Sequence, residues 1–246
     1  MEGLARILDF DPKQGGIYYN RLNFVDLATF DHDEESPIGP MRFTDRVFEH
    51  KKATVCDAVN ILSVKIACSD ISFPIQVYGT VVARDCTDYK CVYLFRRDSD
   101  HCQLINSKKE PSILTGPKRG LALMCDDYVE TDLWVKDHQG RCREFSKRSL
   151  NDLGHSASTG EGIRVLERGF ATGTVAVTYA VVKSAVAATI AVEVLQGEFY
   201  GVITAHTTSI KRSLVLYDTS KVAGDNCHGV IRLMRPAVSV YVKDTL

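Results

Sequence analysis

The sequence lacks an excess of charge of either sign. Its 246 residues include 30 lysines and arginines against 31 aspartates and glutamates, which gives a formal net charge of −1. Non-specific binding to nucleic acid requires a positive field that attracts phosphates. The basic pairs Arg96-Arg97 and Lys118-Arg119 stand beside acids or in expected turns, so nucleic acid is not the expected partner.

A long uninterrupted apolar run is also missing. The most apolar stretch, residues 174–195, contains Lys183 and Glu193, and charged side chains are costly inside a bilayer. The first residues show no basic start followed by an apolar core, which is the pattern of a secretory signal. We therefore expect no membrane partner and a cytoplasmic location, with the nucleus as the other open compartment. In either place the eight cysteines stay reduced.

Closely spaced metal ligands are absent. Four residues separate Cys86 from Cys91, and ten separate Cys91 from Cys102, whereas structural zinc sites usually use C-x-x-C pairs. The sequence therefore favours buried, reduced cysteines at these positions over a zinc site.

Four aspartates offer a weak calcium hypothesis. Two turns carry Asp85, Asp88, Asp98 and Asp100, and clustered loop carboxylates at one end of a sandwich are a common calcium site. Arginines interleave with these acids, so arginine–aspartate pairing is the competing interpretation. We expect no cofactor, and keep calcium or ligand binding as an alternative.

No complete catalytic motif is present. The segment 154–158, GHSAS, resembles a nucleophile elbow but lacks the final glycine of G-x-S-x-G. A polar loop is the favoured interpretation, because no strand-then-helix context surrounds the segment. A hydrolase that uses Ser156 and His155 therefore stays as an alternative to a non-enzymatic protein.

What the sequence does have is apolar and polar residues that alternate over short segments, which is typical of half-buried antiparallel strands. The block Val77–Cys102 shows this most clearly. Residues 175–195 are rich in alanine, but their β-branched residues alternate, so we predict two strands there instead of a helix. Segments 119–125 and 128–136 are expected to pair, residues 137–140 to form a hairpin tip, and residues 148–173 to form a long loop. The predicted fold is all-β, an antiparallel β-sandwich of about ten to twelve strands.

The first residues differ from the rest. An acidic run at residues 31–35 precedes Ser-Pro-Ile-Gly-Pro at 36–40, where prolines prevent regular structure. Aromatic side chains in this region indicate that it packs on the body. We predict an irregular N-terminal arm over residues 1–54 and a β-sandwich domain over residues 55–246.

Several motifs resemble a known family. They are Glu34–Arg42 (EESPIGPMR), Asn60–Ile66 (NILSVKI), the block Val77–Cys102 through Leu94–Asp98 (LFRRD), Leu114–Gly120 (LTGPKRG) and Glu193–Gly201 (EVLQGEFYG). They are similar to an uncharacterised domain family of cereals that also forms the C-terminal part of a jasmonate-induced ribosome-inactivating protein. The resemblance covers about residues 34–243. It implies a β-rich domain in plant stress or defence, and it transfers no catalytic residues.

Two activities associated with that composite protein can be compared with this chain. An RNA N-glycosidase needs a Glu and an Arg one helical turn apart near a tryptophan, and Glu161 and Arg164 have the spacing but no tryptophan follows. Recognition of an RNA cap uses two tryptophans, whereas this chain has only Trp134. The N-glycosidase stays as an alternative hypothesis.

The function we expect is a non-enzymatic protein-interaction module. Exposed aromatic and arginine side chains contribute much of the binding energy of protein interfaces. The residues proposed for the surface are Tyr89, Tyr93, Arg96, Arg97 and Trp134. The competing interpretation is that Tyr93 and Trp134 are core residues.

Overall fold

The structure is a computed structural model, and it describes residues 2–12, 15–40, 55–112, 114–124, 127–137, 139–153, 164–169, 175–208, 210, 212–221 and 229–242. Its regular elements are strands, apart from the short helix α1 (Glu2–Ala5). The strand pairs within its sheets are antiparallel. No helix among the described residues is long and apolar enough to cross a membrane.

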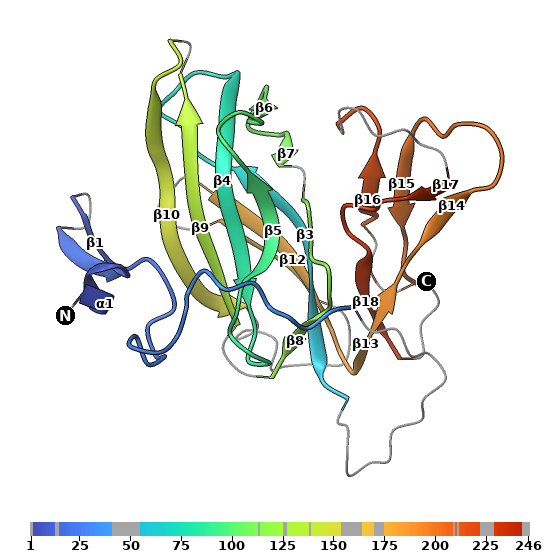
Figure 1. Cartoon of the computed structure of the whole chain (residues 1–246), viewed down its shortest axis with the longest axis horizontal. Helices are drawn as coiled ribbons and strands as arrows, with labels where there is room; N and C mark the ends of the chain where they lie inside the picture. The colour runs from blue at the N-terminus through green and yellow to red at the C-terminus, as the bar shows by residue number, and fades with distance from the viewer. Residues whose placement is uncertain are drawn as a thin grey trace.

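Two five-stranded sheets form the main body (Figure 1). The first has the order β10-β9-β4-β5, and β6 also pairs with β4. Its strands are β4 (Ile75–Arg84), β5 (Val92–Arg97), β6 (Gln103–Ile105), β9 (Asp127–Lys136) and β10 (Cys142–Leu153). The second has the order β11-β12-β3-β7, and β8 also pairs with β3. Its strands are β3 (Asp57–Ile66), β7 (Pro111–Ser112), β8 (Leu121–Leu123), β11 (Arg164–Gly169) and β12 (Val175–Val182).

The main hydrophobic core lies between these two sheets. Side chains that alternate along each strand meet there, because successive residues of a strand point to opposite faces. The buried cluster includes Ile61 of β3, Val77 of β4, Leu133 of β9 and Val177 of β12, each at most 1% exposed. The prediction of an all-β, antiparallel, sandwich-like fold is confirmed, with more strands than expected.

Two local predictions were wrong. Residues 119–125 and 128–136 do not pair, because β8 aligns with Asp57–Val59 of β3 while β9 lies in the other sheet. The expected loop 148–173 contains the last residues of β10 and all of β11, which is an edge strand paired only with β12. An edge strand does not need the apolar pattern of a central strand. Residues 164–169 therefore resemble a strand only weakly in sequence.

The hairpin tip at residues 137–140 is confirmed. Gly140 joins β9 to β10 with φ +76°, and Asp137 Oδ1 accepts hydrogen bonds from the backbone of Gln139 and Arg141 at 2.8 and 3.0 Å. Pro236 stands directly before a strand, where its missing donor does no harm.

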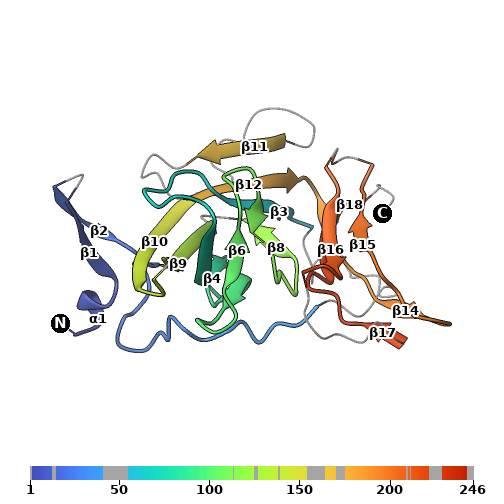
Figure 2. The ribbon, with the colours of Figure 1, turned by 90° about the horizontal axis from the view of Figure 1, so that it is seen from above.

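The C-terminal part adds three two-stranded ladders beside the second sheet (Figure 2). They pair β13 (Ala185–Thr189) with β18 (Ala237–Tyr241), β14 (Val192–Val194) with β17 (Gly229–Ile231), and β15 (Val202–Ala205) with β16 (Leu214–Asp218). These ladders enclose a second hydrophobic cluster. Asn60 of β3 exchanges two hydrogen bonds with the backbone of Ser239 at 2.6 and 2.9 Å, which fixes β18 to the main body.

The N-terminal residues cover part of the outer face of the first sheet. A hairpin of β1 (Leu8–Asp11) and β2 (Gly16–Tyr19) lies beside β10, and residues 20–40 then run across β9, β4 and β5 (Figures 1 and 2). From here on, "the arm" means residues 20–40 alone, the described part of the predicted N-terminal arm that crosses the sheet. The arm covers the part of this face around Arg84 and Glu130, which contact it, and the part around Tyr78 and Trp134 remains partly exposed. We call these parts the covered half and the open half.

Candidate functional site

Leu22 and His32 anchor the arm to the sheet. Both side chains are buried, at 0% and 4% exposure. The backbone N–H of Leu22 donates to Glu130 Oε1 at 2.7 Å. His32 Nε2 lies 2.9 Å from the Leu22 carbonyl oxygen, which can only accept, so Nε2 carries the proton. The first contact ties Leu22 to a carboxylate of β9, and the second joins His32 to Leu22 within the arm.

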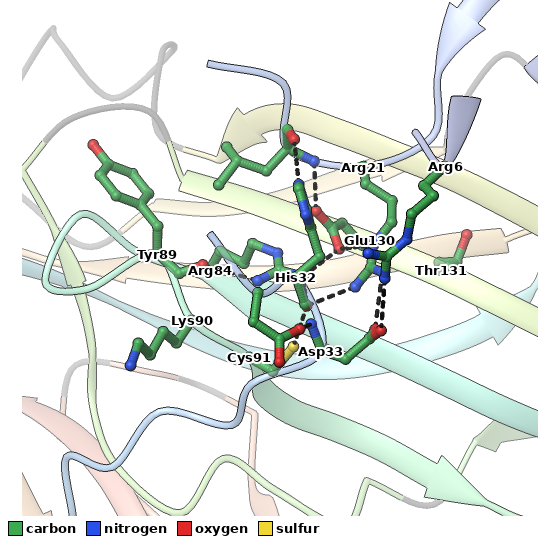
Figure 3. A network of polar contacts seen from close by, with 12 residues as sticks. Arg6, Arg21, His32, Asp33, Arg84, Tyr89, Lys90, Cys91, Glu130 and Thr131 are labelled. Carbon is green, nitrogen blue, oxygen red and sulfur yellow. Dashed lines mark hydrogen bonds and ion pairs between the residues drawn. The ribbon is translucent and has the colours of Figure 1, made fainter. Parts of the chain in front are cut away.

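Arg84 and Glu130 form the centre of the polar network under the arm (Figure 3). Arg84 Nη2 donates to Glu130 Oε2 at 2.8 Å and to the His32 carbonyl oxygen at 2.6 Å, while its Nη1 donates to the Tyr89 carbonyl oxygen at 2.9 Å. Burial lowers the pKa of Arg84, but the hydrogen bond and charge of Glu130 outweigh it and raise the pKa overall. The guanidinium therefore stays charged and holds the arm by its backbone.

Arg21 and Cys91 complete this network. Arg21 donates to the His32 carbonyl oxygen at 2.6 Å and to Asp33 Oδ1 at 2.9 Å. The Cys91 thiol donates to the same His32 oxygen at 3.1 Å, and burial raises its pKa. A nucleophilic cysteine needs the thiolate, so Cys91 has the wrong protonation state for catalysis.

A second network fastens the end of the arm. Arg119 donates to both oxygens of Asp85, at 2.6 and 3.0 Å, and its Nε donates to Ser36 Oγ at 3.2 Å. Ser36 Oγ in turn donates to Asp88 Oδ2 at 2.7 Å. Buried charges are tolerated when they are paired in this way. The arrangement is a structural clamp, and its carboxylates are not free for acid–base chemistry.

Beside this clamp the arm and the edge of β5 enclose a cavity of about 340 Å³, which we call the groove. Arm residues 35–40 form one wall, and Tyr93, Arg96, Thr115, Lys118 and Arg119 contribute to the other. The Arg96 guanidinium lies 4.5 Å from the centre of the Tyr93 ring. Glu35 faces both exposed cations, with Oε1 at 3.3 Å from Lys118 Nζ and Oε2 at 3.7 Å from Arg96 Nη1.

Further aromatic residues lie on the open half of the face. Tyr78 of β4 and Trp134 of β9 are opposite each other in the register, and their ring centres lie 6.5 Å apart. Trp134 Nε1 donates to Asp132 Oδ1 at 2.9 Å. A hydrogen bond with Cys142 raises the pKa of Tyr78 to about 12, so its hydroxyl stays protonated. A hollow lined by Thr80, Arg96, Arg97, Asp98 and His101 lies on the same half.

The chain matches a protein family for which no activity is described. Residues 58–246 match the profile of a family described as Domain of unknown function (DUF6598). The chain belongs to this family. No curated protein and no solved structure matches it. The matched part contains β4, β5 and β9, whereas the arm lies outside it, so the DUF6598 domain supplies the sheet face on which the arm docks.

Four of the five residues predicted for the interaction surface lie on or beside the open half of the face. Tyr93 and Trp134 are half-buried, so neither is a core residue, while Arg96 is exposed and Arg97 is intermediate. Tyr89 lies apart from them, since its ring contacts Phe24 of the arm with centres 5.0 Å apart. The structure thus brings Tyr93 and Arg96 into direct contact and places Tyr89 under the arm. Whether a partner binds there stays a prediction.

The aspartates of the calcium hypothesis do not come together. Asp85 and Asp88 precede β5 and contact Arg119, whereas Asp98 and Asp100 follow β5 at its other end. Asp98 contacts the ring of His101, and this hydrogen bond lowers the pKa of Asp98. In the part of the chain that the structure describes, no group of three or more His, Cys, Asp or Glu side chains is placed to hold a metal.

The residues of the enzyme hypotheses fall outside this geometry. His155, Ser156 and Glu161 lie outside the described residues, and Arg164 begins β11. Arg84 and Glu130 were not among the functional residues predicted from the sequence. The sequence signal that could have found them is a charged side chain in a largely apolar strand, as in β4 and β9. Such a side chain is rarely buried unless it has a charged partner.

Proposed function

We propose that this DUF6598 protein is a non-enzymatic protein-interaction module that binds its partner on the open half of the outer sheet face. One observation carries the proposal. Tyr78, Tyr93, Arg96 and Trp134 are all at least partly exposed on this half, while the arm covers the other half. Aromatic and arginine side chains of this kind are enriched at the centres of interfaces.

The contacts of these side chains support a binding role over a structural one. Arg96 lies over the Tyr93 ring, and its one ion pair among the described residues is with the Glu35 carboxylate at 3.7 Å; its side chain is 62% exposed. Arg84, by contrast, is fully buried and has three acceptors within 3.0 Å. The buried arginine serves the fold, so the exposed one is available to a partner.

Affinity purification of the tagged full-length protein tests the proposal. Wild type is compared with Arg96→Ala and Trp134→Ala, and Tyr200→Ala is the matched control because Tyr200 is 77% exposed in the C-terminal part. We expect one partner to be recovered with wild type and the control and lost with the other two variants. Unchanged recovery with folded Arg96→Ala and Trp134→Ala proteins would end the proposal.

The proposal extends to cellular setting. We place the module in the cytoplasm of a plant cell, in stress or defence. The support is the resemblance of its motifs to the cereal family, together with free thiols at the described cysteines, which a reducing compartment preserves. Immunofluorescence of the endogenous protein before and after a stress treatment would test this, and an extracellular signal would contradict it.

A further inference from the structure

The groove between the arm and β5 carries more positive than negative charge. Arg119 is neutralised behind the groove by Asp85 and Asp88. The other charges in the lining are Arg96 and Lys118 against Glu35. The clamp holds two carboxylates against one guanidinium, so groove and clamp together are balanced, and the positive surplus is confined to the face formed by Arg96 and Lys118. A concave site with unbalanced charge attracts ions of the opposite sign.

The contacts of Glu35 are loose in comparison with those of the clamp. Glu35 lies 3.3 and 3.7 Å from its two cations, whereas Asp85 receives Arg119 at 2.6 and 3.0 Å. Charge-assisted hydrogen bonds are normally about 2.7–2.9 Å long. Among the residues that the structure describes, Glu35 therefore leaves donors of Arg96 and Lys118 without a close acceptor, and it is itself 42% exposed.

We propose that the groove is an anion-binding site that takes a phosphoryl or carboxylate group between Arg96 and Lys118. Glu35 is the built-in occupant that such a group displaces. The Tyr93 ring, which Arg96 already covers at 4.5 Å, forms an apolar wall beside the anion. Ser36 and Thr115 place further polar atoms in the lining.

The chemistry of the ligand follows from this lining. Once Glu35 is displaced, a dianion neutralises both Arg96 and Lys118, which a single carboxylate cannot do, so a phosphoryl group next to an aromatic or extended segment fits the groove best. The inference rests on the proposed function in one respect, because it takes the anion to be carried by a partner protein. An anionic side chain of that partner would then sit beside the aromatic residues of the open half.

Titration calorimetry of the purified full-length protein with small anions tests the site without a partner. The probes are phenyl phosphate, inorganic phosphate and benzoate, so that phosphoryl, aromatic and carboxylate contributions separate. We expect phenyl phosphate to bind most tightly. Arg96→Gln and Lys118→Gln should each weaken it about tenfold, the loss of one charge-assisted hydrogen bond. Glu35→Gln should tighten it, because the competing carboxylate is gone.

Lys108→Gln is the control, since Lys108 is equally a lysine but is exposed on the loop before β7 and outside the groove. Equal effects of Arg96→Gln and Lys108→Gln would overturn the site, and so would the absence of phenyl phosphate binding at millimolar concentration. Tighter binding of benzoate than of phenyl phosphate would overturn the preference for a phosphoryl group. These results do not involve a partner. Failure of the anion site is thus distinguishable from failure of the interaction module, which shows as unchanged partner recovery with Arg96→Ala.

Discussion

The covered and open halves of one sheet face use arginine in opposite ways. Under the arm, Arg84 is fully buried, and Glu130, His32 and Tyr89 accept its hydrogen bonds. On the open half, Arg96 lies over an aromatic ring, and the Glu35 carboxylate is 3.7 Å from it. The two residues stand on adjacent strands of the same sheet.

This difference separates stability from recognition. A buried charge that loses its partner is strongly destabilising, whereas an exposed ion pair contributes little to folding. Substitutions on the covered half should therefore unfold the protein or release the arm. Substitutions on the open half should leave the fold intact and affect only binding.

The largest expected effect tests this contrast directly. Arg84→Ala leaves Glu130 buried with its main partner removed, so we expect the free energy of unfolding to fall by about 3–5 kcal/mol. Arg96→Ala, the matched change on the open half, should alter it by no more than about 0.5 kcal/mol. Urea unfolding followed by fluorescence measures both. Similar losses for the two variants would mean that the halves do not differ.

A smaller effect is expected where the two halves meet. A Cβ atom on Gly116 would lie 1.9 Å from the Tyr93 carbonyl oxygen, so Gly116→Ala must push residues 115–117 away from β5. Overpacking of this kind costs about 1–3 kcal/mol. The control is Gly39→Ala, since Gly39 lines the groove and, its chain neighbours aside, no described atom lies within 4 Å of its added Cβ. Equal melting temperatures for the two variants would contradict the close approach.

The main strands could be predicted from the sequence because their apolar residues alternate. β9 was expected over residues 128–136, nearly the bounds observed, and so was the turn at Gly140. The edge strand β11 was missed, and so was the pairing of β8 with β3. Both depend on which strands become neighbours, and local patterns do not encode this.

The site was predictable only in part for the same reason. Tyr93 and Arg96 were chosen by residue type, and the structure places them in contact. Glu35 and Lys118 are 83 positions apart in the sequence and meet only because the arm folds back over β5. No spacing rule relates them. Composition can therefore suggest which residues bind, but the groove itself comes from the tertiary fold.

The pH dependence of stability should reveal the covered half. Burial lowers the pKa of His32 from its ordinary value of 6.5, and the nearby charges of Arg21 and Arg84 lower it further, against the Leu22 hydrogen bond and the charge of Glu130. Below pH 6.5 the unfolded state then binds more protons than the folded state, so stability falls as the pH falls from 6.5 toward the lowered value. Above pH 6.5 the contribution of His32 is complete.

Urea unfolding of wild type and His32→Gln at a series of pH values measures this dependence. We expect the difference in stability between the two proteins to shrink as the solution is acidified below pH 6.5. His206→Gln serves as the control, since His206 is exposed, and it should leave the wild-type pH profile unchanged. A His32→Gln profile parallel to that of wild type would show that His32 does not cause the acid sensitivity.

The smallest expected effect concerns Glu35, which belongs to the arm but faces the open half. Its side chain is 42% exposed, and those of its partners Arg96 and Lys118 are 62% and 71% exposed. Exposed pairs of this kind contribute about 0–1 kcal/mol. We expect Glu35→Gln to lower the free energy of unfolding by less than about 0.5 kcal/mol, within reach of replicate urea titrations. A loss comparable to that of Arg84→Ala would mean that the contacts of Glu35 in the groove hold the arm in place. Glu35 would then belong to the covered half, where side chains stabilise the fold.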